Sequence, residues 1–324
     1  MRTDHLRFGW VTAIALMEAA CSLTAQDSPR FSSVQVLPDG DVSLRLAASV
    51  GHPCRIDVSA NLADWTGLVT VAGSSSVEHL DSAGPYFDVR FYRAEQLVDP
   101  SSFLGDHLAT SAGDAVMRPL NHASLVLQWN GQTIYVDPTT AAGPFSSLPK
   151  ADLILITHSH ADHFDTGTLT TLGQDGTRIV APAAVQPSLP AVLKPLTTVL
   201  TNGGQTAVLG LVIEAVPAYN ANHPKGSGNG YVINLGGKRL YVSGDTGDTP
   251  ETRALANIDL AFLCMNQPYT LTVTQAVSIV RQFRPKIVYP YHYRNQNGTL
   301  ADVNAFKRQV GTDLGIEVRL RKWY

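Results

Sequence analysis

The stretch that decides the fold is "ILITHSHADHFD", residues 154–165. Its last eight positions hold three of the chain's 10 histidines and two aspartates, and they follow an apolar run directly. That run, "ADLILIT" at residues 151–157, has the length and β-branched content of a buried strand. The cluster is therefore expected at the end of a strand, where the sheet passes into a loop.

The spacing of the polar residues predicts a metal site. In extended backbone, residues two apart share a face, so His158, His160 and Asp162 are expected to converge, while His163 turns to the other side. Imidazole and carboxylate are natural zinc ligands, and His-x-His-x-Asp-His places four of them within six positions. By chance, this pattern would arise in fewer than about one chain in a thousand of this composition.

Further candidate ligands stand at the ends of later strands. They are His223 in "AYNANHPKGSGNGY", Asp245 in "YVSGDTGD" and His292 in "YPYHYR". Two metal ions need more ligands than the first cluster supplies, including a carboxylate that bridges, and these positions could provide them. Asp137 in "YVDP" is interpreted as a carboxylate that orients a ligand histidine, with a turn cap as the alternative.

Several of these motifs resemble one enzyme superfamily. "THSHADH", "SGDT" and "YPYHYR" look like the metallo-β-lactamase-fold hydrolases, and the resemblance covers essentially Asn121 to Tyr324. "LAFLCMNQPYTLT" and "EVRLRKWY" are similar to the branch with L-ascorbate-6-phosphate lactonase and the phospholipase D that acts on N-acyl-phosphatidylethanolamine. The resemblance implies an α/β fold, the αββα sandwich, with the metals at one edge of the sheets.

Carried over by position, the resemblance implies a complete ligand set. The first ion would be held by His158, His160 and His223, the second by Asp162, His163 and His292, with Asp245 bridging the two. The implied cofactors are two divalent metal ions, zinc in the first place and manganese or iron as alternatives. Many relatives place a ligand directly after the strand, where this chain has Asn220, so Asn220 stays open as an alternative to His223.

Other residues are expected near the metals. Asp162 is the candidate catalytic residue, which would orient the attacking water and receive its proton. His122, in "NHASLVLQW", resembles a family position near the site, although a structural role is an equal alternative. The candidate substrate-binding residues, for an anionic group, are His122, Lys225, Tyr269, Tyr291 and Arg294.

The predicted activity is hydrolysis by metal-bound hydroxide. A lactone, ester or phosphodiester is favoured as substrate, because the "His-Thr-Pro-Gly-His"-like stretch of many β-lactamases and of glyoxalase II is absent. A Gly-x-Ser-x-Gly elbow is absent too, which disfavours a serine nucleophile. Two alternatives remain: a β-lactamase, and a non-catalytic exported binding protein in which the metal domain is structural.

The N-terminus predicts export. Arg2 and Arg7 precede the mostly apolar residues 8–17, and cleavage is expected after Ala25, so residues 1–25 are interpreted as a signal peptide. The apolar part is too short to span a bilayer, which needs ~20 residues. The protein is therefore expected to be periplasmic or secreted.

The rest of the chain is expected to form two domains. Residues 26–100 alternate apolar and polar positions between turns and predict a small all-β sandwich, which loosely resembles an accessory module of exported bacterial proteins. Residues 98–114 are interpreted as the linker, and residues 101–324 as the hydrolase domain. Trp65 is expected in the core of the sandwich.

Charge narrows the class of partner. The 24 Lys and Arg residues against 27 Asp and Glu give a net charge of −3, and no basic run stands out. Nucleic acid is therefore not expected as a partner, and neither is stable membrane insertion. A small-molecule substrate is expected, and the sequence leaves the oligomeric state open.

Overall fold

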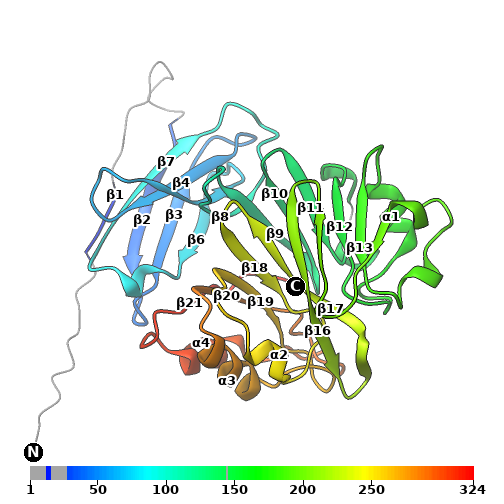
Figure 1. Ribbon diagram of the computed structural model, residues 1–324. Helices are drawn as coiled ribbons and strands as arrows, with labels where there is room; N and C mark the ends of the chain where they lie inside the picture. The colour runs from blue at the N-terminus through cyan, green and yellow to red at the C-terminus, as the bar shows by residue number, and fades with distance from the viewer. Residues whose placement is uncertain (1–11, 16–27, 144) are drawn as a thin grey trace, which may run out of the picture. The chain divides into compact units, whose positions relative to one another are not determined.

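The computed structural model describes residues 12–15, 28–143 and 145–324 of the chain (Figure 1). It divides into two compact units, Met1–Ala109 and Thr110–Tyr324. The expected signal peptide, residues 1–25, lies outside the described residues except for the short strand β1 at Thr12–Ala15. Export therefore stays a prediction, and so do the domain limits.

In its described residues, the first unit contains β-strands and no α-helix. Its strands are β1 (Thr12–Ala15), β2 (Arg30–Val36), β3 (Val42–Ala47), β4 (Cys54–Ser59), β5 (Thr66–Val71), β6 (Val77–Asp81), β7 (Val89–Gln96) and β8 (Gly105–Leu108). Within this unit they pair in the orders β2-β3-β6 and β1-β7-β4-β5-β8. Alternation along β3 turns Val42, Leu44 and Leu46 inward, where they pack with Ile56 and Tyr92.

One expectation for the first unit was wrong, and the expected linker contains a strand. Gly105–Leu108, within the expected linker, forms β8 because its backbone pairs with β5. Trp65 does not belong to the buried core; its ring is only partly buried, and the guanidinium of Arg93 lies over it at 4.6 Å. The indole of Trp65 is therefore covered on one face by the Arg93 cation and not by apolar side chains of the core.

The second unit contains two mixed sheets. The first is ordered β9-β10-β11-β12-β13-β14 within this unit, and the second β15-β16-β17-β18-β19-β20-β21. The strands of the first sheet are β9 (Ala115–Asn121), β10 (Ser124–Trp129), β11 (Gln132–Val136), β12 (Leu153–Leu155), β13 (Arg178–Ala181) and β14 (Thr197–Val199). Those of the second are β15 (Gln205–Val208), β16 (Leu211–Asn220), β17 (His223–Leu235), β18 (Lys238–Val242), β19 (Leu260–Cys264), β20 (Ile287–Tyr291) and β21 (Glu317–Val318).

Helices cover the outer faces of both sheets, as expected for the αββα sandwich (Figure 1). They are α1 (Thr166–Leu172), α2 (Pro250–Arg253), α3 (Val273–Phe283) and α4 (Val303–Val310). The side chain of Asp165 caps α1, and Thr272 and Gln275 form a capping box at α3, so both helices begin where local sequence signals place them. Their apolar faces are buried; α3, for example, buries Ile279 and Phe283.

The topology gathers several strand ends at one edge. β11 and β12 run parallel, and so do β18, β19 and β20. Parallel neighbours share the edge at which their carboxyl ends lie, and ligands bind at that edge in many α/β folds. Asp137 follows β11, Asp245 follows β18 by a short turn, and His292 follows β20 directly.

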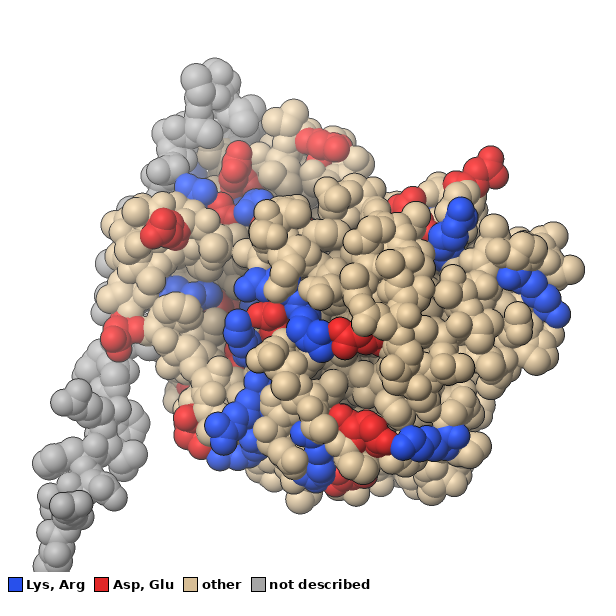
Figure 2. Space-filling model, in the orientation of Figure 1, with Lys and Arg blue, Asp and Glu red and all other residues tan. Residues whose placement is uncertain are grey.

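Two surface properties bear on possible partners. None of the helices in the described part of the chain is long and apolar enough to cross a membrane. On the face that Figure 2 shows, acidic and basic side chains are interspersed. The expectations about nucleic acid and membrane insertion stay predictions.

Candidate metal centre

The loop after β12 brings its polar side chains together by a turn, not by extended backbone. The strand ends at Leu155, and the carbonyl oxygen of His160 accepts hydrogen bonds from the N–H groups of His163 at 3.0 Å and Phe164 at 2.8 Å. The expectation that alternation along a strand would align these ligands was wrong. The turn directs His163 inward, where it is fully buried, while Asp162 stays 44% exposed.

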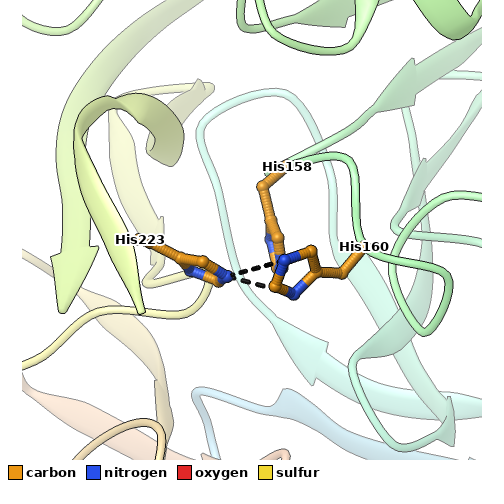
Figure 3. Close-up of side chains that lie close together, drawn as sticks. All are labelled: His158, His160 and His223. Carbon is orange, nitrogen blue, oxygen red and sulfur yellow. Dashed lines mark hydrogen bonds between the residues drawn. The ribbon is translucent and has the colours of Figure 1, made fainter. Parts of the chain in front are cut away.

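Three histidines form the first group. His158 and His160 come from the loop after β12, and His223 comes from the start of β17, across the site (Figure 3). Nε2 of His223 lies 3.0 Å from Nδ1 of His160, and the ring centroids of His158 and His223 are 4.5 Å apart. Each residue offers a ligand nitrogen within 4.8 Å of the others.

The second group combines carboxylates with histidines. Nε2 of His163 and Nε2 of His292 are 3.0 Å apart. Oδ2 of Asp162 lies 3.7 Å from Nε2 of His163 and 3.6 Å from Nε2 of His292. The structure thus brings together the three residues that the sequence assigned to a second ion.

Asp245 lies between the two groups. Its Oδ1 is 3.4 Å from Nε2 of His163 and 3.3 Å from Nε2 of His292. Its Oδ2 is 4.0 Å from Nε2 of His158, in the first group. One carboxylate therefore directs one oxygen to each group, which is the arrangement a bridging ligand needs.

A buried carboxylate orients two of the histidines. Nδ1 of His163 donates to Oδ2 of Asp137 over 2.7 Å, and the hydroxyl of Thr157 donates to the same oxygen over 2.6 Å. Because the hydroxyl proton of Thr157 is used in this way, Thr157 accepts from Nδ1 of His158 at 3.0 Å. In both histidines Nδ1 donates, so Nε2 is the nitrogen left to bind an ion; at His163 an ion would replace a proton on Nε2, because the pKa of that imidazole is raised to about 9. Asp137 therefore has the orienting role expected of it.

The hairpin between β16 and β17 places the imidazole of His223, and not the amide of Asn220, beside the other histidines of the first group. The register of the two strands shifts between Ala218 and Asn220, so that Asn220 and His223 pair across a two-residue turn. The Asn220 side chain stays in the hairpin: its Oδ1 accepts from the N–H of His223 at 3.1 Å, and its Nδ2 donates to the carbonyl oxygen of Asp245 at 3.0 Å. The imidazole of His223, in contrast, points to His160 (Figure 3).

Three non-glycine residues at this edge have a left-handed backbone conformation. His122, Asp137 and His292 have φ values of +53°, +45° and +47°. Non-glycine residues adopt this region at a cost of roughly 1 kcal/mol or more, which the surrounding contacts must offset. One such contact is direct, since the N–H of His292 donates to the carbonyl oxygen of His122 over 3.1 Å.

The turn before Asp245 requires a glycine. Gly244 has a φ of +59°, and a Cβ there would lie 3.0 Å from the carbonyl oxygen of Asn229 and 3.0 Å from Cβ of Thr157. A larger residue would displace the turn. Gly244 therefore shapes the turn that directs Asp245.

Burial and charge set the protonation of the groups. Burial lowers the pKa of His158 well below its usual value, so His158 is neutral at pH 7. Burial alone would lower the pKa of His163 as well, but the carboxylates of Asp245 and Asp137 outweigh it and raise that pKa to about 9. Burial alone would raise the pKa of Asp245, whereas the nearby histidines hold it below its usual range.

The donor set fits divalent metal ions. Among the described residues, Nε2 of His158 and Oδ1 of Asp245 are buried side-chain atoms with no hydrogen-bond partner. A buried polar atom without a partner costs about 1–3 kcal/mol, and cations bound in the two groups would remove that cost. Nitrogen and carboxylate oxygen together suit zinc and its first-row neighbours.

The candidate substrate-binding residues have different surroundings. Tyr291 is 0% exposed and packs edge-on against Phe262, so its assignment to substrate was wrong: β20 lies between β19 and β21, and residues 288–291 are all buried. Lys225 forms an ion pair with Glu251, and its ammonium group lies 5.4 Å from the centroid of the Tyr219 ring. Tyr269 lines a pocket, and Arg294 is exposed with its guanidinium 4.0 Å above the ring of Tyr324.

The pocket borders the hairpin that carries His223. It has a volume of ≈ 470 Å³, and its lining includes Tyr219, Asn220, Thr249, Tyr269 and Gln275. Asn220 also contacts the backbone of Asp245, so one residue joins the pocket wall to the metal centre. Of the candidate substrate-binding residues, Tyr269 alone lines this pocket.

Three residues that contact histidines of the centre were not expected from the sequence. Thr157 holds His158, the amide of Asn266 lies 3.1 Å from Nδ1 of His292, and the hydroxyl of Tyr324 lies 3.0 Å from Nδ1 of His122. Thr157 adjoins the motif and could have been found there. Asn266 and Tyr324 stand in segments whose similarity to one branch of the family was noticed, but no spacing connects them to their histidines.

Comparisons with known proteins agree with this geometry. A family described as the beta-lactamase superfamily domain matches residues 117–292, more than half of the 324-residue chain and the part that carries every candidate ligand. A UPF0173 metal-dependent hydrolase of Pyrococcus abyssi is 30% identical over 206 residues, which are 59% of this chain and 90% of that protein.

Two solved structures are similar as well. One, described as a metal-dependent hydrolase from Parabacteroides distasonis, is 39% identical with a TM-score of 0.61, over 68% of this chain and 98% of that one. The metallo hydrolase Igni18 from Ignicoccus hospitalis is 25% identical with a TM-score of 0.55, over 64% of this chain and 94% of that one. The chain belongs to the beta-lactamase superfamily, with the metallo-β-lactamase fold, and is a metal-dependent hydrolase that uses divalent metal.

Proposed function

We propose that this protein is an exported hydrolase with two divalent metal ions, zinc in the first place, which cleaves a lactone, ester or phosphodiester. His158, His160 and His223 would hold one ion, and Asp162, His163 and His292 the other. The observation that carries the proposal is the position of Asp245, whose two carboxylate oxygens face the two groups of ligands.

Bound divalent ions lower the pKa of a coordinated water to about 7 and polarise the oxygen of the bond that is cut. The protein's own residues supply the orientation. Asp137 and Thr157 fix two ligand histidines, and Gly244 fixes the turn before Asp245. Second-sphere contacts of this kind typically change metal affinity or activity by about 10–100-fold.

Asp162 is the exposed carboxylate of the centre, and we assign it the orientation of the attacking water and the acceptance of its proton. Burial alone would raise its pKa, but hydrogen bonds from His122 and His292 hold that pKa far below its usual range. A carboxylate held in its ionised form in this way can accept a hydrogen bond from the water and so orient it.

The substrate class rests on sequence resemblance together with the pocket. The sequence resembles the branch that contains a lactonase and a phospholipase D, and both of these enzymes act on organic substrates with a part remote from the bond that is cut. The pocket of ≈ 470 Å³ beside Asn220 could accept the part of the substrate that is remote from the bond cut. Tyr269, in its wall, is the candidate contact.

The test is a metal titration joined to a substrate panel. The full chain is freed of metal with a chelator and titrated with zinc, manganese or iron(II), while hydrolysis of a lactone, a p-nitrophenyl ester, bis-p-nitrophenyl phosphate and nitrocefin is followed. Turnover that saturates at two ions per chain is expected, on one of the first three substrates. Saturation at one ion, or cleavage of nitrocefin alone, would contradict the proposal.

A further inference from the structure

The hydroxyl of Tyr324 joins two residues at the edge of the metal centre. It accepts a hydrogen bond from the backbone N–H of Arg294 over 3.1 Å and lies 3.0 Å from Nδ1 of His122. The ring of Tyr324 is held on two sides, by the guanidinium of Arg294 at 4.0 Å and edge-on by Tyr293 at 5.0 Å. The hydroxyl therefore has a fixed position.

These contacts determine which nitrogen of His122 carries the proton. An ionised carboxylate can only accept, so Nε2 of His122, beside Oδ2 of Asp162, carries a proton, and Nδ1 of the neutral ring accepts from the hydroxyl of Tyr324. A neutral imidazole that accepts at Nδ1 carries its proton on Nε2. Nε2 of His122 lies 3.1 Å from Oδ2 of Asp162 and can donate to it.

Packing and backbone hold His122 in this position. Its ring centroid is 3.8 Å from that of His292, and its side chain is 19% exposed. Its backbone carbonyl accepts from the N–H of His292, in the left-handed conformation described above. Ring packing thus fixes His122 against His292, and a hydrogen bond fixes it against Asp162. Both partners are candidate ligands of the second group.

We propose that Tyr324 is a positioning residue, which acts through His122 to hold the Asp162 carboxylate in the orientation that catalysis needs. The inference rests on the proposed function, in which Asp162 orients the attacking water. Both ring nitrogens of His122 are engaged, at Tyr324 and at Asp162, so His122 serves as the connection between them and not as a further metal ligand.

The first test is Tyr324→Phe in the zinc-loaded full chain, with bis-p-nitrophenyl phosphate as substrate. The substitution keeps the ring against Arg294 and removes only the hydroxyl. We expect kcat to fall about 10-fold while KM and the bound zinc stay unchanged. The matched control is Tyr293→Phe, which removes a hydroxyl that donates to the carbonyl oxygen of Arg321 at 3.2 Å, and it should keep kcat.

A double-mutant cycle tests whether Tyr324 acts through His122. The loss of kcat in Tyr324→Phe/His122→Ala should equal that in His122→Ala alone, because the hydroxyl has no other route to Asp162. His122→Gln, whose amide can accept from Tyr324 and donate to Asp162, should recover part of the loss. Additive losses would overturn the proposal, and so would release of an ion from His122→Ala, which would make His122 a ligand.

The second test does not need activity. In the metal-free full chain labelled with ¹⁵N-histidine, long-range ¹H–¹⁵N correlations show which ring nitrogen of His122 carries the proton. We expect the proton on Nε2 in the wild type and in Tyr324→Phe, with the Nδ1 resonance shifted in the variant because Nδ1 loses the hydrogen bond from the hydroxyl. An unchanged Nδ1 resonance in the variant would overturn the positioning role, whereas a wild type inactive on the whole panel but with the expected Nδ1 shift in the variant would contradict the proposed function alone.

Discussion

Nδ1 of His163 lies 2.7 Å from Oδ2 of Asp137, and neither side chain is exposed to solvent. Asp137 also accepts from the N–H of Thr157 at 2.7 Å through its other oxygen. Both oxygens of one carboxylate are therefore acceptors, for donors that come from the loop carrying the first four candidate ligands. The pair connects the carboxyl ends of β11 and β12 to the metal centre.

Replacement of Asp137 by asparagine tests this connection. Asparagine tolerates the left-handed backbone at this position, where φ is +45°, so the turn should persist. Its NH₂ group, however, would face a donor, and His163 would lose its orientation. We expect the affinity for the second ion to fall about 10–100-fold, measured by competition with a chromophoric chelator.

The control for this variant is Asp152→Asn. Asp152 accepts from the N–H of Thr133 at 2.8 Å and from Nε2 of Gln174 at 3.1 Å, at the amino ends of the same two strands. It should keep wild-type metal affinity even if it lowers stability. Equal losses of affinity in the two variants would mean that the effect of Asp137 is general and not directed through His163.

His223→Ala should release the first ion selectively. Asp162, His163, Asp245 and His292 remain to hold the second, and activity should fall at least ~100-fold because the two-ion site is lost. Asn220→Ala should keep two ions, since Asn220 contacts backbone groups of the hairpin. Metal analysis that gave two ions in the His223 variant and one in the Asn220 variant would reverse the assignment.

The ion pair of Asp81 and Arg90 makes the first unit sensitive to acid. Burial alone would raise the pKa of Asp81, but Arg90 lowers it below its usual value, as do bonds from Ala83 and Tyr92. A carboxyl whose pKa is depressed on folding contributes stability above its unfolded pKa of about 4 and loses it as the pH falls through the lower, folded pKa. Stability should therefore decline below pH ~4.

Asp81→Asn tests this dependence by urea unfolding of the full chain. At pH 7 it should cost about 3–5 kcal/mol, because it leaves the guanidinium of Arg90 buried without a counter-charge. The difference from wild type should shrink as the pH falls below ~4. Asp88→Asn, at an exposed position in the same unit, should cost little at either pH. A difference independent of pH would contradict this account.

The first unit should be dispensable for chemistry. All seven candidate ligands lie within the second unit, Thr110–Tyr324. A shortened protein that begins at Thr110 is expected to bind two ions and to turn over small substrates at the wild-type rate, measured by metal analysis and steady-state kinetics. If the shortened protein is folded by circular dichroism but lacks an ion, the first unit takes part in the site.

Export should be visible in the mature N-terminus. Residues 1–25 have the order of a signal peptide, with cleavage expected after Ala25. N-terminal sequencing of the protein from its native cell should begin near Gln26, and fractionation should place it outside the cytoplasm. Protein that retains Met1 in the cytosolic fraction would refute the prediction.

The sequence by itself determined the parts of this protein that depend on neighbouring residues. The motif from His158 to His163 identified the family and four candidate ligands, and Asp165, which closes the same stretch, caps α1. These signals are local: ligand spacing within a loop and the first turn of a helix involve only a few consecutive residues.

Only the tertiary structure decided which distant residues complete the centre. The register shift before Asn220 brings His223 to the other histidines. Such a shift is set by the pairing of two strands, so the sequence of one strand does not predict it. The position of β20 inside its sheet buries Tyr291, and the packing around Arg294 places Tyr324 against His122, 202 positions away in sequence. These choices depend on long-range pairing and side-chain packing, whose outcome a single local pattern does not specify.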